Sequence, residues 1–86
     1  MELVFSDAAK RELENLPAEL KPVFLKHLEK ILGMPPRRHL GYGIPYCVDN
    51  ATKQARIIYK LEKDRVYIMH CFKNHKEYER WYKSYK

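Results

Sequence analysis

The sequence predicts a small α+β domain, in the order β-α-α-β-β-β-α, whose antiparallel sheet packs against two N-terminal helices plus a C-terminal helix. Two runs rich in β-branched and aromatic residues, 55–61 and 65–73, predict neighbouring strands. Two segments with apolar residues at helical spacing precede these runs, and a third follows them. Because 86 residues can bury only one core, we expect residues 1–86 to form a single domain.

The chain opens with a short strand and a helix. Residues 2–5 are predicted to form the strand, and Ser6 or Asp7 can cap the helix that follows. Pro17 ends this helix. Its apolar residues are Ala8, Ala9, Leu13 and Leu16.

A second helix is predicted from about residue 18 to residue 32. Pro22 is tolerated only in a first turn, so the regular part can begin there, and Gly33 is a stop signal. His27 lies on or beside the apolar stripe; we expect it to form a local hydrogen bond and assign it no function. The stripe comprises Leu20, Val23, Phe24, Leu28 and Ile31.

A loop predicted at residues 34–43 separates these helices from the remaining strands. Its basic run is Arg37, Arg38 and His39. This run either grips phosphate or is merely solvated, and the sequence leaves both open. An edge strand is expected at residues 44–49, because Pro45 is tolerated only at an edge.

The two central runs are predicted to form a β-hairpin with a short polar reversal at residues 62–64. We place the turn on Lys63 and Asp64, which sets the register of the two strands. The resulting cross-strand pairs are Leu61 with Val66, Tyr59 with Ile68, and Arg56 with Cys71.

This register divides the hairpin into two faces. The face predicted to join the core holds Ile57, Tyr59, Leu61, Val66, Ile68, His70 and Phe72. The face predicted to be the working surface holds Arg56, Ile58, Lys60, Tyr67, Met69, Cys71 and Lys73. His70 is therefore expected to serve packing. A β-bulge would shift one strand by one residue and exchange its faces.

Asn74 can cap a last helix and Glu77 can reach back to it, which places His75 in the first turn. Tyr78 and Tyr82 follow on the same side as His75. The aromatic stripe of this helix is Tyr78, Trp81, Tyr82 and Tyr85. Because such a stripe more often packs against a sheet than stacks on bases, we expect at most two of its members to be functional.

Three cationic or titratable side chains come close in this arrangement. Arg56 lies in mid-strand, Lys73 at a strand end and His75 at a helix start. Together they form a catalytic-looking cluster on a basic surface. Two of them also have a plainer interpretation, because Arg56 can pair with an acidic neighbour and His75 can be an ordinary surface residue.

Basic residues are concentrated in the second part of the chain. The net charge is +6, and residues 52–86 hold ten Lys or Arg against four Asp or Glu, whereas residues 1–51 are balanced. Interleaved with seven tyrosines in the whole chain, this charge favours a polyanionic partner, nucleic acid first, over a purely solubilising surface.

No run approaches the length of a membrane span and the N-terminus lacks the pattern of a signal peptide, so we expect a complete, cytoplasmic protein without a membrane partner. Cys47 and Cys71 have no histidine or cysteine at metal-ligand spacing, so no metal site is expected. We expect two small buried or half-buried thiols and no disulfide.

Two stretches of the chain match the pattern of a known family. The first, at positions 4–17, is Val-Phe-Ser-Asp-Ala-Ala-Lys-Arg-Glu-Leu-Glu-Asn-Leu-Pro. The second is Ala-Arg-Ile-Ile-Tyr-Lys-Leu at 55–61, followed by Val-Tyr-Ile-Met-His-Cys-Phe at 66–72. Through them, nearly the whole chain resembles the RelE/ParE superfamily of toxin-antitoxin systems, which implies a RelE-like fold.

The resemblance implies an endoribonuclease toxin that needs no cofactor, cleaves messenger RNA in the ribosomal A site and is held inactive by a RelB-like antitoxin. It implies that Arg56 contacts the scissile phosphate, with His75 and Tyr78 as the matching histidine and helix aromatic. Two family features are replaced here: the lysine-rich second strand by Tyr-Cys-Val-Asp at 46–49, and the paired basic residues by Lys-Asn-His at 73–75. The chain therefore looks closer to histidine-using branches such as YoeB and YafQ.

The implied chemistry needs a base for the 2′-hydroxyl, cations for the phosphorane-like charge and an acid for the leaving oxygen. His75 is the best acid or base, with Asp49 competing as base and Tyr78 as acid. Arg56 and Lys73 suit the charge-stabilising role. The residues expected to bind or stack on RNA are Arg37, Arg38, His39, Lys60, Tyr67 and Tyr82, with Tyr78 as a further stacking candidate.

Two other functions fit the same resemblance. One is a ParE-like inhibitor that binds DNA gyrase without cleaving RNA; because that branch lacks the histidine, His75 favours the nuclease. The other is a non-catalytic module that binds nucleic acid or antitoxin, which the missing second-strand lysines permit. In each case we expect an acidic or amphipathic antitoxin that covers the basic sheet face or displaces the last helix.

Overall fold

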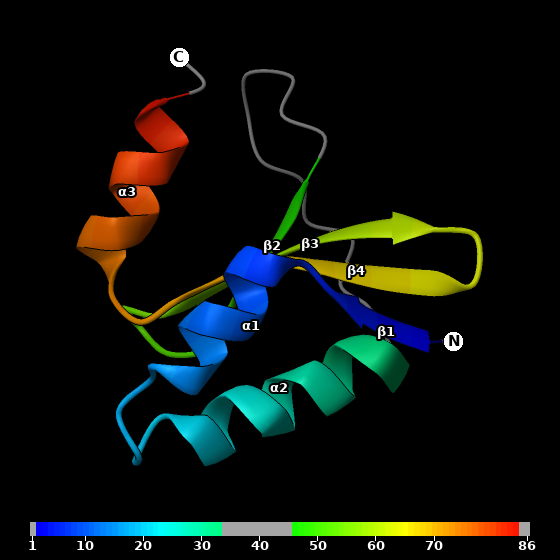
Figure 1. Cartoon of the computed structure of the whole chain (residues 1–86), viewed down its shortest axis with the longest axis horizontal. Helices are drawn as coiled ribbons and strands as arrows, with labels where there is room; N and C mark the ends of the chain where they lie inside the picture. Colours follow the sequence, from blue (N-terminus) through cyan, green and yellow to red (C-terminus); the bar gives the residue numbers. More distant parts are fainter. Residues whose placement is uncertain (1, 34–45, 85–86) are drawn as a thin grey trace.

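The computed structural model describes residues 2–33 and 46–84, and its elements follow the predicted order (Figure 1). They are β1 (Glu2–Phe5), α1 (Asp7–Glu14), α2 (Lys21–Gly33), β2 (Cys47–Asn50), β3 (Arg56–Glu62), β4 (Arg65–Phe72) and α3 (His75–Lys83). The fold is the α+β class that the sequence predicts. None of the helices in these two ranges has the length and apolar character needed to cross a membrane.

The sheet has the strand order β1-β4-β3-β2. Strands β2, β3 and β4 pair antiparallel, whereas β1 runs parallel to β4. The sheet is therefore mixed, and the prediction of an antiparallel sheet is wrong for this one pair. A parallel pair needs a long connection, and the chain between β1 and the hairpin supplies one because it contains both N-terminal helices.

Helices α1 and α2 cover one face of the sheet, the inner face, and α3 lies against the other, the outer face (Figure 1). The inner core is built around Ala9, Phe24, Leu28, Ile31, Ile57, Tyr59, Val66 and Ile68, all fully or almost fully buried. Full burial of such a large apolar side chain contributes about 1.5–3 kcal/mol. The inner face thus stabilises the fold and leaves the outer face available for function.

Helices α1 and α3 each begin with the side-chain cap that the sequence predicts. The Ser6 hydroxyl accepts a hydrogen bond from the backbone N–H of Ala9 at 3.0 Å, and Asn74 Oδ1 accepts one from that of Glu77 at 2.9 Å. Helix α2 begins at Lys21, later than the predicted residue 18, and Pro22 falls in its first turn as expected.

A β-bulge divides the hairpin into two halves. Near the turn, the predicted pairs of Leu61 with Val66 and Tyr59 with Ile68 are confirmed. The register then shifts so that Ile58 pairs with His70, which leaves Met69 as the extra residue on β4. Arg56 consequently lies opposite Phe72, not Cys71 as predicted.

This bulge exchanges the faces of β4 beyond Met69. Cys71, expected on the working surface, is 1% exposed and belongs to the inner core. Phe72, expected in the inner core, packs with Ile58 in the outer cluster. His70 follows Phe72 to the outer face, because their rings stack with centroids 4.8 Å apart. The prediction that His70 packs in the inner core is therefore wrong.

Candidate active site

The outer face carries a small apolar cluster of Val48, Ile58 and Phe72, on which Tyr78 and Trp81 of α3 pack. This arrangement confirms that the aromatic stripe of the last helix docks on the sheet. Within α3, which the structure describes in full, no residue is completely buried. The aromatic side chains thus form a half-exposed wall beside the polar residues of the same face.

Arg56 is held at the end of this wall by backbone and aromatic contacts. Its Nη1 donates to the carbonyl oxygens of Thr52, Lys53 and Ala55 at 3.1, 3.0 and 3.0 Å. Its Cζ lies 5.6 Å from the centroid of the Tyr78 ring, within range of a cation–π interaction. Arg56 forms no ion pair with a carboxylate in residues 2–33 and 46–84, so the plainer interpretation of an acid-paired arginine is not supported.

His75 lies on the same aromatic residue. Its ring centroid is 5.7 Å from that of Tyr78, and its side chain is 44% exposed. Nε2 of His75 lies 3.1 Å from the Glu79 carboxylate, one turn further along α3. Arg56 and His75 therefore both contact Tyr78, and we call these three residues the Arg56 cluster.

Lys73, the fourth predicted catalytic residue, points elsewhere. Its Nζ lies 3.8 Å from the Glu77 carboxylate. It lines a hollow of about 220 Å³ together with residues of α1 and the buried end of β4. The hollow is lined by Arg11, Glu12, Asn15, Leu16, Cys71, Lys73 and Glu77. The structure thus does not bring Lys73 into the Arg56 cluster.

The predicted RNA-binding residues divide into three groups. Lys60 and Tyr67 line a shallow outer-face hollow of about 320 Å³ with Tyr46 and Met69. The hydrogen bond from Lys60 to Glu62, at 2.6 Å, raises the pKa of the Lys60 ammonium. Tyr82 contacts the Tyr78 ring at 5.8 Å. The remaining residues, Arg37, Arg38 and His39, lie outside the described residues, as does the predicted stripe residue Tyr85.

Asp49, the predicted competitor for the base, lies on the wrong face. It pairs with Ile57 of the inner face, is 6% exposed, and its Oδ2 lies 2.8 Å from Nδ1 of His27 on α2. The prediction of a local hydrogen bond for His27 is also wrong, because this contact links residues 22 positions apart. The pair ties α2 to β2 beneath the sheet and cannot reach a ligand on the outer face.

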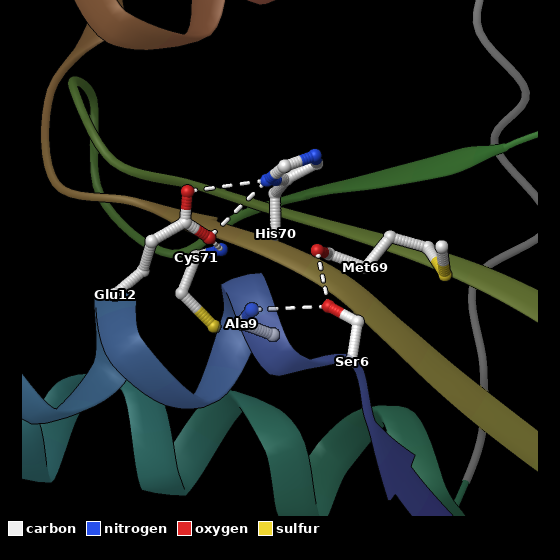
Figure 2. A network of polar contacts seen from close by, with 6 residues as sticks. All are labelled: Ser6, Ala9, Glu12, Met69, His70 and Cys71. Carbon is white, nitrogen blue, oxygen red and sulfur yellow. Dashed lines mark hydrogen bonds and ion pairs between the residues drawn. The ribbon is translucent and has the colours of Figure 1, made fainter.

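Sequence reasoning missed a second polar site, at the edge of β4 beyond the end of β1 (Figure 2). There the Ser6 hydroxyl donates to the carbonyl of Met69 at 2.8 Å. Glu12 of α1 accepts the backbone N–H of Cys71 at 2.9 Å and lies 3.1 Å from Nδ1 of His70. The sequence carries no signal for this site, because it depends on the β-bulge that turns His70 outward.

Both described cysteines are buried thiols, as predicted. Burial raises the pKa of the Cys71 thiol to about 12, with a smaller contribution from the Glu12 carboxylate, and burial also raises the pKa of Cys47. Neither side chain is thus a candidate nucleophile, because the thiolate is the reactive form.

We expect these thiols to destabilise the folded state at alkaline pH. In the unfolded chain a thiol ionises near its ordinary value of 9.0, whereas in the folded protein Cys71 stays protonated up to about 12. The free energy of unfolding should therefore fall above pH 9, by up to about 1.4 kcal/mol per pH unit for Cys71, and the raised pKa of Cys47 acts in the same direction. Urea titrations of the wild type and Cys71→Ala between pH 8 and 10 measure this slope, and equal slopes would contradict the assignment.

No protein-family model matches this chain, and no curated protein does. Solved structures do match. The isolated Escherichia coli RelE toxin has a TM-score of 0.72 and 19% identity, over 95% of each chain. A YoeB/ParE toxin from Agrobacterium tumefaciens has a TM-score of 0.70 and 16% identity, over 84% of this chain and 96% of that one. The E. coli RelBE toxin-antitoxin complex gives a TM-score of 0.71 and 20% identity, over 83% and 93%. At such identities the likeness establishes a shared fold.

Proposed function

From the RelE/ParE toxin fold of this chain, we propose that the protein is the toxin of a type II toxin-antitoxin pair and cleaves messenger RNA in the ribosomal A site. The observation that carries the proposal is the Arg56 cluster on the outer face. Arg56 is fixed by three carbonyls and the Tyr78 ring, and no carboxylate of the described residues forms an ion pair with it. A positioned arginine of this kind suits the charge of a scissile phosphate.

The cluster supplies the cation and the acid that 2′-hydroxyl attack on phosphorus requires, together with a ring on which a base can stack. Arg56 stabilises the charge that develops on the phosphorane-like transition state. His75 carries the imidazole that can give a proton to the departing 5′-oxygen, and its Nε2 lies 3.1 Å from the Glu79 carboxylate. Tyr78 offers a face on which a base can stack, next to both groups.

The proposal includes an antitoxin partner. Similar folds include the E. coli RelBE toxin-antitoxin complex and a heterotetrameric YoeB-YefM toxin-antitoxin complex from Staphylococcus aureus. A protein surface with a net charge of +6 would bind cellular RNA indiscriminately unless a partner covered it. An acidic or amphipathic antitoxin suits this role. Co-purification of the chain with the product of a neighbouring gene tests this point, and the absence of a complex at low salt would count against it.

The deciding experiment is messenger RNA cleavage on programmed ribosomes, mapped by primer extension. Cleavage within the A-site codon is the expected result with the wild-type protein. Intact RNA would contradict the nuclease proposal, and a gyrase supercoiling assay would then test ParE-like inhibition. Growth arrest on expression would separate either toxin from a non-catalytic binding module.

We expect His75→Ala to lower the cleavage rate by about a hundredfold, because the group that protonates the leaving oxygen is lost. Since the side chain is 44% exposed, stability should change by less than about 0.5 kcal/mol. His75→Gln is the matched variant, because it keeps a polar side chain at the helix start but cannot transfer a proton. The neighbouring Lys76→Ala controls for lost surface charge. Full activity of His75→Gln would assign His75 a structural role.

A further inference from the structure

The outer face carries a second histidine with a carboxylate partner, and nothing in the proposed function uses it. We propose that His70 is the proton acceptor of the cleavage reaction and that Glu12 is the positioning residue that holds its ring (Figure 2). This inference rests on the proposed endoribonuclease function. It identifies the base that the sequence leaves open and that Asp49, paired with His27 on the inner face, cannot supply.

Glu12 fixes the position of the proton on the His70 ring. The two carboxylate oxygens lie 3.2 and 3.1 Å from Nδ1, and one of them also accepts the backbone N–H of Cys71 at 2.9 Å. An ionised carboxylate only accepts hydrogen bonds, so Nδ1 must carry the hydrogen. In neutral His70 the lone pair is therefore on Nε2, as in other carboxylate-histidine pairs that act as bases.

The ring itself is held from two sides. It stacks on Phe72 with centroids 4.8 Å apart and planes 13° apart, and it contacts Trp81 of α3 at 5.5 Å. Its side chain is 24% exposed, and Nε2 forms no hydrogen bond within residues 2–33 and 46–84. An oriented acceptor on a partly exposed side chain is what a general base requires.

The other two histidines of the described ranges differ in this respect. His75 has Nε2 against Glu79, and His27 is bound to Asp49 on the inner face. His70 is thus the histidine whose Nε2 is left open on the outer face. The two outer histidines can then take separate roles, with His70 as the acceptor and His75 as the donor.

The sheet register puts His70 near the phosphate-binding arginine. Ile58 pairs with His70 and Arg56 pairs with Phe72, so Arg56 and His70 are diagonal neighbours on one face. Such neighbours lie about 7–8 Å apart. A nucleotide whose phosphate is held by Arg56 can therefore place its ribose toward His70.

The charged groups around the pair come from three elements. Glu12 and Arg11 belong to α1, Glu77 belongs to α3, and Lys73 follows β4; all four line the hollow beside Cys71. Ile58 on β3 and Trp81 on α3, which also face the ring, carry no charge. Glu12 is thus the charged group in direct contact with His70.

The step balances with the residues at hand. The Nε2 lone pair of His70 takes the 2′-hydroxyl proton while the 2′-oxygen bonds to phosphorus. The bond from phosphorus to the 5′-oxygen breaks, and its electron pair leaves with that oxygen, which takes a proton from the His75 imidazolium. The products are a 2′,3′-cyclic phosphate and a free 5′-hydroxyl.

The first test is kinetic and uses the full chain on programmed ribosomes. His70→Asn keeps an N–H that can donate to Glu12 but has no basic nitrogen, so kcat should fall at least about a hundredfold while KM stays within about twofold. The acid limb of the kcat/KM profile should disappear. Glu12→Gln should lower kcat about tenfold, because a glutamine no longer fixes the proton on Nδ1. Thermal melting checks that both variants are folded.

The second test needs no substitution. Nitrogen-15 NMR of the wild-type protein should find the hydrogen of neutral His70 on Nδ1, and Glu12→Gln should shift it partly to Nε2. Two results would overturn the role of His70 alone. One is a hydrogen on Nε2 of neutral His70 in the wild type. The other is full activity of His70→Asn on messenger RNA that the wild type cleaves on the same programmed ribosomes. Failure of the wild type to cleave would overturn the proposed function, and with it the need for a base.

Discussion

Arg56→Ala is expected to lower the rate of A-site cleavage by at least about a hundredfold, which corresponds to about 2.7 kcal/mol of transition-state stabilisation. The variant removes the one guanidinium that three carbonyls and Tyr78 hold on the outer face. Single-turnover cleavage on programmed ribosomes measures the loss. Since no inner-core residue is changed, the melting temperature should stay within a few degrees.

Two variants separate geometry from charge at this position. Arg56→Lys keeps the positive charge but cannot form two parallel bonds to a phosphate, so it should recover only part of the rate. Lys10→Ala removes one charge from an exposed position of α1 and should leave the rate unchanged. If Lys10→Ala were as slow as Arg56→Ala, net charge alone would explain the loss.

Asp49→Ala should lower the free energy of unfolding by about 2–3 kcal/mol, because it leaves His27 without the carboxylate that lies 2.8 Å from its Nδ1. For a domain of this size such a loss is a large part of the total stability. Urea denaturation measures it. The folded fraction should cleave RNA at the wild-type rate, since Asp49 lies on the inner face.

A double-mutant cycle with His27→Ala isolates the pair. We expect a coupling energy of about 1–2 kcal/mol, because each single variant removes the same contact. Asp64→Ala, in the hairpin turn, is the control variant because it also removes one carboxylate. It should leave the free energy of unfolding nearly unchanged. A hundredfold slower reaction of folded Asp49→Ala would instead return Asp49 to the list of candidate bases.

The parts of the fold that the sequence predicts correctly are mostly those that depend on local signals. The first strand, the caps at Ser6 and Asn74, and the turn at Lys63 and Asp64 each depend on a few adjacent residues, and all are confirmed. The parallel pairing of β1 with β4 depends on contacts more than 60 residues apart, which no local pattern encodes. The bulge at Met69 also has no local mark, because the residues on either side of it suit both faces.

The candidate site follows the same division. The extra residue of the bulge belongs to β4, so the predicted faces of β3 are unchanged and Arg56 lies on the outer face. His75 and Tyr78 follow from the Asn74 cap, so the sequence brings these three together. His70 lies beyond the bulge on β4, so the alternation along the strand predicts the wrong face for it. Its partner Glu12 is 58 residues away, so only the folded chain reveals the pair.

The contact between Glu12 and β4 also protects the sheet against unwanted assembly. Beyond Ile68, no strand formed by residues 2–33 or 46–84 lies beside β4 on the β1 side, and an open edge of this kind invites β-augmentation by an extended peptide or by another copy of the chain. Here the carboxylate of Glu12 occupies the backbone N–H of Cys71, and the Ser6 hydroxyl occupies the carbonyl of Met69. An added strand would have to expel both groups, and a hydrogen bond to a charged group alone is worth about 1.5–3 kcal/mol. The same glutamate that orients a histidine therefore acts as a gatekeeper against aggregation.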